Sequence, residues 1–157
     1  MCPVCPEDEA LLYSLYGASR QEELDAWGWR PQEREAFLGM QYRLQQQSYR
    51  SQYPESDHWI IVHEEQRVGQ VRIDRSGDDL RLVDLSLLPA WRGRGIGTQL
   101  LRELQMEAGA AGRSILLSVV EGSPAGRLYE RLGFETVGQP SVYRQMRWKP
   151  YMGHVVK

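Results

Sequence analysis

One stretch, residues 80–104, constrains the fold of this chain more than any other. It reads L-R-L-V-D-L-S-L-L-P-A-W-R-G-R-G-I-G-T-Q-L-L-R-E-L. An apolar run ends at Pro89, glycines follow at Gly93, Gly95 and Gly97, and leucines then recur at helical spacing. The stretch therefore predicts a strand, a tight glycine loop and a helix.

A junction of this kind is suited to binding an anion. Glycines let the main chain turn sharply and approach a ligand, and the first unpaired amides of the helix point at negative charge. Arg92 and Arg94 add two cations, and a helix that begins near Ile96 directs its amides at a diphosphate. The loop therefore predicts a phosphate-bearing cofactor.

Two familiar glycine motifs do not match this loop. A Walker loop needs a lysine after its glycines, and the dinucleotide fingerprint needs a glycine where Thr98 stands. The remaining pattern, Arg92-x-x-Gly95-x-Gly97, resembles the coenzyme A pyrophosphate loop of the GNAT superfamily of N-acetyltransferases. Taken alone, the same residues also suit an ordinary glycine-rich turn.

A second segment carries the resemblance further. Residues 114–120 (S-I-L-L-S-V-V) are typical of a parallel strand buried on both faces, and residues 121–134 read E-G-S-P-A-G-R-L-Y-E-R-L-G-F. Ser123 suits a helix N-cap, Pro124 the first helical position and Gly133 the helix end. The pattern P-A-x-x-L-Y-E-R-L-G-F is similar to the family's second coenzyme A motif.

The resemblance implies that acetyl-CoA is the cofactor and that three segments bind it. Pantetheine is expected to pair with the main chain of the central strand, the diphosphate with the glycine loop, and further atoms with the second motif. The implied cofactor-binding residues are Leu85, Ser86, Leu87, Leu88, Arg92, Gly93, Arg94, Gly95, Ile96, Gly97, Thr98, Ser123, Ala125, Leu128 and Tyr129.

The same resemblance implies acetyl transfer to an amine. By position, the amide of Leu87 is the group that stabilises charge on the thioester oxygen, and Tyr129 donates the proton that the departing thiolate needs. A packed helix tyrosine is the alternative role of Tyr129. Some family members have a glutamate where this chain has Ser118. Asp84 is therefore assigned as the general base, with a structural role as its alternative and Glu121 as the other nearby carboxylate.

The N-terminal third is expected to form the acceptor side of the site. Residues 6–16 and 31–51 read as helices joined by a connection over 17–29. In the family the first two helices help to form the acceptor pocket. The alternative is that the aromatic residues belong to the core and the glutamines face solvent. The hypothesised substrate-binding residues are Trp29, or Trp27 in its place, with Gln41, Gln45 and Tyr49.

The remaining elements complete an α/β prediction. Residues 58–63 and 68–75 read as strands joined by a turn over 64–67, and 135–137 with 142–148 as a closing pair. A central mixed, mostly antiparallel sheet flanked by helices is expected. Its two central strands, 80–88 and 114–120, should be parallel with a right-handed crossover, and in the family they splay apart. Prolines near the N-terminus leave little room for an opening strand.

Length and charge bound the function classes. The 157 residues suit a single domain over 1–157, with 149–157 as a loosely ordered tail. A net charge of −2 gives no general electrostatic reason to bind nucleic acid or an acidic membrane. No apolar run is long enough to span a membrane and no signal pattern opens the chain, so a cytoplasmic protein is expected.

The cysteines and histidines do not indicate a metal site. Cys2 and Cys5 form a lone C-x-x-C without histidines at ligand spacing, so a free, incidental pair and no metal are expected. The leading function is an acetyltransferase acting on a small-molecule or peptide amine. The alternative is a GNAT-fold module that binds acyl-CoA or a partner without turnover. Homodimers are frequent in the superfamily, so a homodimer is possible.

Overall fold

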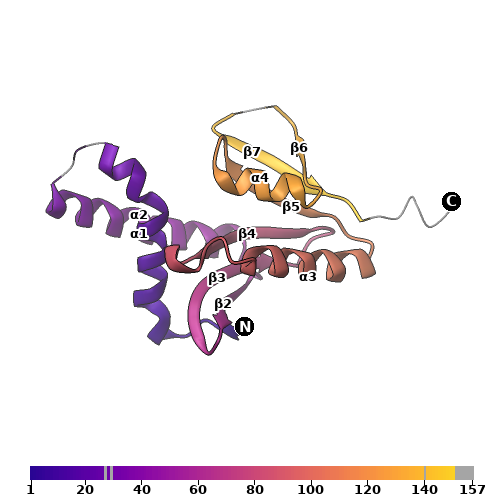
Figure 1. The fold of residues 1–157 in the computed structure, drawn as a ribbon, viewed down its shortest axis with the longest axis horizontal. Coiled ribbons are helices and arrows are strands. Elements are labelled where there is room, and N and C mark those ends of the chain that lie inside the picture. The colour runs from indigo at the N-terminus through magenta and orange to yellow at the C-terminus, as the bar shows by residue number, and fades with distance from the viewer. Residues whose placement is uncertain (27, 29, 140, 151–157) are drawn as a thin grey trace. The chain divides into compact units, whose positions relative to one another are not determined.

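The computed structural model describes residues 1–26, 28, 30–139 and 141–150. Within these residues seven strands form one sheet in the order β1-β2-β3-β4-β5-β7-β6 (Figure 1). The strands are β1 (Cys2–Pro3), β2 (Asp57–His63), β3 (Gln66–Asp74), β4 (Leu80–Leu87), β5 (Ile115–Val120), β6 (Glu135–Val137) and β7 (Tyr143–Trp148). The helices are η1 (Pro6–Asp8), α1 (Glu9–Ala26), α2 (Pro31–Gln52), η2 (Pro89–Trp91), α3 (Ile96–Ala110) and α4 (Pro124–Arg131).

This arrangement confirms the predicted mixed α/β fold. Strands β4 and β5 are parallel, with Leu80–Leu82 opposite Ile115–Leu117, and α3 lies between them in the chain. Strand β7 runs antiparallel to both β5 and β6. None of the helices in the described part of the chain is both long and apolar enough to cross a membrane.

The described residues form two compact units. Unit 1 comprises residues 1–72 and 84–91, and unit 2 comprises residues 73–83 and those from Arg92 onward. The predictions of a single domain and of splayed β4 and β5 strands therefore stay predictions.

The core of unit 1 is built around α1 and α2. Leu12, Tyr16, Tyr42 and Ile60 are buried together, and apolar side chains from β1 and both helices pack against them. Strand β1 has only two residues, Cys2 and Pro3, which pair antiparallel with β2. The short opening strand agrees with the expectation drawn from the prolines. Both cysteines are free thiols.

Two local predictions in unit 1 were wrong. The connection predicted over residues 17–29 is helical as far as Ala26, so α1 continues through Gly17. The cost of one glycine in a helix is small, and packing of α1 against α2 outweighs it. The turn between β2 and β3 is shorter than predicted. It consists of Glu64 and Glu65, both with positive φ, as in a two-residue hairpin.

In unit 2, buried aliphatic side chains hold α3 against the sheet. Strands β4 and β5 contribute Leu80 and Ile115, α3 contributes Leu101, and β7 contributes Met146, each at most 1% exposed. The closing strands lie close to their predicted bounds. Lys149 and Pro150 lie outside any helix or strand. The rest of the predicted tail, 151–157, lies outside the described residues.

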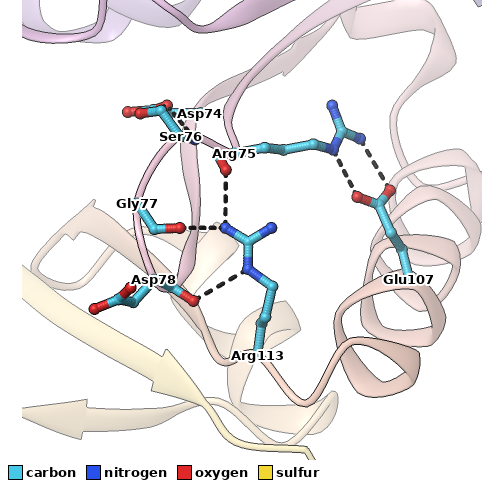
Figure 2. Close-up of polar contacts among 7 residues, drawn as sticks. All are labelled: Asp74, Arg75, Ser76, Gly77, Asp78, Glu107 and Arg113. Carbon is cyan, nitrogen blue, oxygen red and sulfur yellow. Dashed lines mark hydrogen bonds and ion pairs between the residues drawn. The ribbon is translucent and has the colours of Figure 1, made fainter.

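Polar contacts fasten the turn between β3 and β4 to the end of α3. Figure 2 shows the Arg113 guanidinium donating to the main-chain carbonyls of Arg75, Gly77 and Asp78. Beside it, Arg75 forms a bidentate ion pair with Glu107 of α3, with N···O distances of 2.6 and 2.9 Å. Arg113 therefore satisfies several carbonyl groups at once, whereas the Arg75–Glu107 pair is partly exposed.

These contacts predict different costs for two substitutions. Arg113→Ala is expected to lower the free energy of unfolding by about 1–2 kcal/mol, because three carbonyls lose a charged donor. Glu107→Gln, the control, should cost less than about 1 kcal/mol because the ion pair is partly exposed. Urea denaturation measures both values. Equal losses would contradict the role assigned to Arg113.

Candidate active site

Unit 1 contains a cavity of about 100 Å³ between its two long helices and its strands. Apolar side chains of Leu12, Leu15 and Leu85 form part of its lining. The remainder is mostly polar and comes from α1, α2, β2, β3 and β4. A concave site with an apolar part and a few converging polar groups is the usual form of a ligand-binding site.

Strand alternation places polar residues along one side of this cavity. Gln70 and Arg72 are two residues apart on β3, and Asp84 and Ser86 are two residues apart on β4, so each pair points to one face of the sheet. All four line the cavity. Gln70 is 5% exposed and Arg72 is 9% exposed. Polar groups buried to this extent need hydrogen-bond partners.

A hydrogen-bonded chain links the arginine to the aspartate. Arg72 Nη2 lies 3.0 Å from His58 Nδ1, and His58 Nε2 lies 2.8 Å from Gln70 Oε1. Because arginine can only donate, Nδ1 accepts, and the proton of a neutral His58 resides on Nε2. Gln70 Nε2 then donates to Asp84 Oδ2 at 3.0 Å and to Ser86 Oγ at 2.9 Å. These contacts determine the orientation of the Gln70 amide and of the His58 imidazole.

The pKa shifts of His58 and Asp84 agree with these hydrogen-bond assignments. Burial lowers the pKa of His58, and the positive charge of Arg72 lowers it further, so the imidazole is neutral near pH 7. Burial raises the pKa of Asp84, while hydrogen bonds from Gln70 and the Leu85 amide, and the charge of Arg72, act to lower it. The Asp84 residue is partly exposed, yet protein atoms surround its carboxyl group closely. Such a group can exchange a proton with a ligand.

Two of the four hypothesised substrate-binding residues line this cavity. They are Gln45 and Tyr49 of α2. Gln41 does not line it, because the helix face toward the cavity carries Tyr42 and the residues three, four and seven positions later. Trp29, like Trp27, lies outside the described residues. The predicted face was therefore offset by one residue.

The main chain at the end of β4 is partly engaged. The Leu88 amide donates to the Val68 carbonyl at 2.8 Å, and the Leu88 carbonyl accepts from the Trp91 amide at 2.9 Å. Strand alternation turns the Leu87 amide to the edge opposite that of the Leu88 amide. The Leu88 amide and carbonyl are therefore already used within the protein, and the pairing of pantetheine with the main chain of this strand stays a prediction.

The glycine loop of unit 2 has the geometry expected of an anion site. Gly93 and Gly95 have φ of +73° and +82°, which side chains other than glycine rarely adopt. Gly95 is the N-cap of α3, and Ile96, the first helical residue, is buried. Amides in the first helical turn have no acceptor within their own helix. The Arg92 and Arg94 side chains are exposed at the same loop.

The second motif contains a polar atom that needs a partner. Ser123 is the N-cap of α4, yet its side chain makes no capping hydrogen bond. Its Oγ is buried and has no partner among the described residues. A donor or acceptor on a ligand would satisfy it, so the residues at the start of α4 fit a bound cofactor. Tyr129, 8% exposed, packs its ring on Phe134.

Sequence reasoning did not identify several residues of the cavity. His58, Gln70, Arg72 and Tyr42 were outside the predicted set. One signal was present in β3, where Gln70 and Arg72 alternate with Val71 and Ile73, a pattern of one polar and one apolar face. It did not reveal that helices cover the polar face. The nearness of His58 to Gln70 and Arg72 depends on the pairing of separate strands.

The chain was compared with known proteins. A family model described as "Acetyltransferase (GNAT) domain" matches residues 54–136, which is more than half of the chain. No curated protein matches it significantly. PaiA N-acetyltransferase from Thermoplasma acidophilum, solved in complex with coenzyme A, has 20% identity and a TM-score of 0.67, covering 93% of this chain and 95% of that one.

Two further solved structures are similar. One, described as "histone acetyltransferase HPA2 and related acetyltransferase" from Corynebacterium glutamicum, has 22% identity and a TM-score of 0.67, over 96% of this chain and 95% of that one. The ribosomal-protein-S18-alanine N-acetyltransferase of Escherichia coli has 20% identity and a TM-score of 0.56, over 68% and 77%. At such identities the likeness concerns the fold alone. Because the family model spans residues 54–136, the chain belongs to the GNAT acetyltransferase family.

Proposed function

We propose that the chain transfers an acetyl group from acetyl-CoA to a primary amine by direct attack on the thioester. The observation that carries the proposal is the Asp84 carboxylate in the wall of a small polar cavity, with its orientation set by Gln70 and the Leu85 amide. Membership of the acetyltransferase family supports the reaction class. The amine specificity and the cofactor are the proposed parts.

The cofactor is assigned to residues whose geometry fits it. The glycine loop with Arg92 and Arg94 would hold the diphosphate, and Ser123 would contact the cofactor through its unpartnered Oγ. When bound, acetyl-CoA supplies an acetyl group activated as a thioester. The amides of α3 and the two arginines contribute positive charge to that end of the molecule.

Asp84 is proposed as the general base. A lysine-like amine has a pKa of about 10.4 and an α-amino group one of about 8, so either must lose a proton before it attacks. Asp84 accepts that proton while the new N–C bond forms and the C–S bond breaks. The hydrogen-bonded chain from Arg72 through His58 and Gln70 orients the carboxylate, and its donors act against the rise in the pKa of Asp84 that burial causes.

Two further groups complete the proposed reaction. The Leu87 amide is proposed to stabilise the negative charge that develops on the thioester oxygen. Tyr129 is proposed to protonate the departing thiolate.

The test of the proposed function is release of the coenzyme A thiol in the presence of acetyl-CoA and a panel of amines. Turnover on any amine supports the enzyme.

Replacing Tyr129 tests the acid. Tyr129→Phe keeps the ring that packs on Phe134 and removes only the hydroxyl. We expect kcat to fall about a hundredfold or more with an unchanged KM for acetyl-CoA, and the melting temperature checks that the fold is kept. Tyr143→Phe, in an exposed residue of β7, is the control. Equal kcat values in the two variants would remove Tyr129 from the mechanism.

One observation favours the alternative, a module that binds acyl-CoA without turnover. Ser118 stands where some family members carry a glutamate, and its hydroxyl lies 2.7 Å from Gln145 Oε1 on the neighbouring strand β7. Ser118 therefore makes a cross-strand contact and supplies no carboxylate. Binding of acetyl-CoA without thiol release on any amine would favour this alternative.

A further inference from the structure

One polar group in the wall of the unit 1 cavity has no partner. Tyr42 is 5% exposed, and its hydroxyl makes no hydrogen bond within the described residues. Burial raises the pKa of Tyr42, and the nearby Glu9 carboxylate raises it further through polar contact with the hydroxyl and through its charge, although the two groups do not meet at hydrogen-bond geometry. Buried phenol groups normally find a partner, so the hydroxyl is also available to a ligand atom in the cavity.

The rings around Tyr42 hold the hydroxyl in position. Tyr13 stacks on Tyr42 with ring centroids 5.4 Å apart, and Tyr16 lies against it at 5.6 Å. Tyr13 directs its own hydroxyl away to Glu35, 3.2 Å from the carboxylate, and does not line the cavity. The unpartnered hydroxyl is therefore held in place by packing and does not result from a loose side chain.

The cavity also contains one positive and one negative group. Arg72 and Asp84 both line it, and no direct ion pair joins them in the part of the chain that the structure describes. The other titratable groups of the lining are His58, which is neutral, and three tyrosines. With Asp84 ionised, the net charge of the lining residues is thus zero, while the Glu9 carboxylate adds a negative charge that acts on Tyr42 from outside the lining.

Arg72 has N–H groups that its contacts with the described residues do not use. Within that part of the chain it donates to Ser56, Gln46 and His58, which accounts for three of the five N–H groups of a guanidinium. The guanidinium lies 5.4 Å from the centroid of the Tyr49 ring, and its charge also acts on Tyr42. A carboxylate is the ligand group that matches a guanidinium beside a phenol hydroxyl.

We propose that the acceptor is a small free amino acid, whose amine meets Asp84 and whose carboxylate meets Arg72 and the Tyr42 hydroxyl. A zwitterion leaves the net charge of the cavity at zero, whereas an amine without a carboxylate adds an uncompensated charge. A cavity of about 100 Å³ suits an acceptor with a short side chain, such as glycine or alanine. The inference rests on the proposed function and narrows its substrate class.

The first test compares three acceptors of similar size. Thiol release from acetyl-CoA is measured with alanine, alaninamide and ethylamine. We expect kcat/KM for alanine to exceed that for either of the others by about tenfold or more, since only alanine carries the carboxylate. Equal values for alanine and alaninamide, or a preference for ethylamine, would overturn the proposal while leaving the acetyltransferase intact.

The second test uses Tyr42→Phe, with Tyr13→Phe as the matched control on the stacked ring. Tyr42→Phe should raise the KM for alanine about tenfold, leave the KM for acetyl-CoA unchanged, and leave the melting temperature unchanged or higher because an unsatisfied group is removed. Tyr13→Phe should leave the KM for alanine unchanged. If both variants keep the wild-type KM for alanine, Tyr42 does not bind the acceptor and the proposal is wrong.

A binding measurement separates the two proposals. Alanine at high concentration should raise the melting temperature of the wild type, but not of Tyr42→Phe, and alaninamide should not raise it in either. A rise with alanine and no turnover on any amine would support the amino-acid site and overturn the enzyme. If alanine neither raises the melting temperature nor is preferred in turnover, the amino-acid site is overturned.

Discussion

Asp84→Asn is expected to lower the kcat for acetyl transfer by at least about a hundredfold, the usual contribution of a positioned base. Asparagine keeps an oxygen that can accept a hydrogen bond from Gln70 or the Leu85 amide, but it cannot take the proton of the amine. The rate of thiol release at saturating acetyl-CoA measures the effect. The melting temperature of the variant checks that the fold is kept.

Glu121→Gln is the matched control for this prediction. Glu121 is the other carboxylate considered from the sequence, and in the structure it is exposed and lies 3.8 Å from Arg144 Nε. Its replacement should leave kcat within about twofold, since partly exposed ion pairs contribute little. A large loss in Glu121→Gln with none in Asp84→Asn would reverse the assignment of the base.

The pH dependence of turnover has a definite sign. Burial raises the pKa of Asp84 above its usual 3.8, and a base is active only when it has lost its proton. Activity is therefore lost as the pH falls through the raised pKa, at a higher pH than an ordinary aspartate would give. The pH–rate profile of Asp84→Asn should therefore lack the decrease at low pH that titration of Asp84 causes. Ionisation of the amine itself contributes a separate slope that both proteins share.

Gly95→Glu is expected to abolish the stabilisation of the protein by acetyl-CoA. In the wild type, a hundredfold excess of acetyl-CoA over its dissociation constant should add about 2.7 kcal/mol to the free energy of unfolding. The substitution places a carboxylate at the N-cap of α3, where a diphosphate is proposed to bind, and gives a side chain to a residue with φ of +82°. Thermal melting with and without acetyl-CoA measures the shift.

Gly138→Glu separates loss of the site from loss of the fold. Gly138 has φ of +75° and lies between β6 and β7, outside the loop, so its substitution brings the same charge and a similar backbone strain. This variant should keep the shift caused by acetyl-CoA even if its melting temperature without ligand is lower. If Gly95→Glu keeps the full shift, the loop does not bind the diphosphate.

The elements that carry the two coenzyme A type motifs could be predicted from local patterns. The strand, glycine loop and α3 lie within one or two residues of their predicted bounds, because positive-φ glycines and a helical leucine spacing are local properties. The same holds for α4, where Ser123 and Pro124 mark its start. Prediction failed at Gly17, where the weak local preference of one glycine was overcome by packing between α1 and α2.

The cavity of unit 1 could not be predicted in this way. Gln45 and Tyr49 were anticipated, but the cavity face of α2 is centred one residue away from the predicted one, which leaves out Gln41. His58, Gln70 and Asp84 belong to three strands, and their hydrogen-bonded chain depends on strand register. A shift of one residue in register would turn the Gln70 side chain to the other face of the sheet.

The sequence by itself determined the order of the elements, the coenzyme A type motifs and the identity of the charged residues, since these depend on composition and short spacing. Only the tertiary structure decided which polar side chains share a cavity, which nitrogen of His58 carries the proton, and that the Tyr42 hydroxyl is buried without a partner. The physical reason is that burial and hydrogen-bond partners are set by contacts between residues distant in the chain, whereas periodicity and turn preference are set by neighbours.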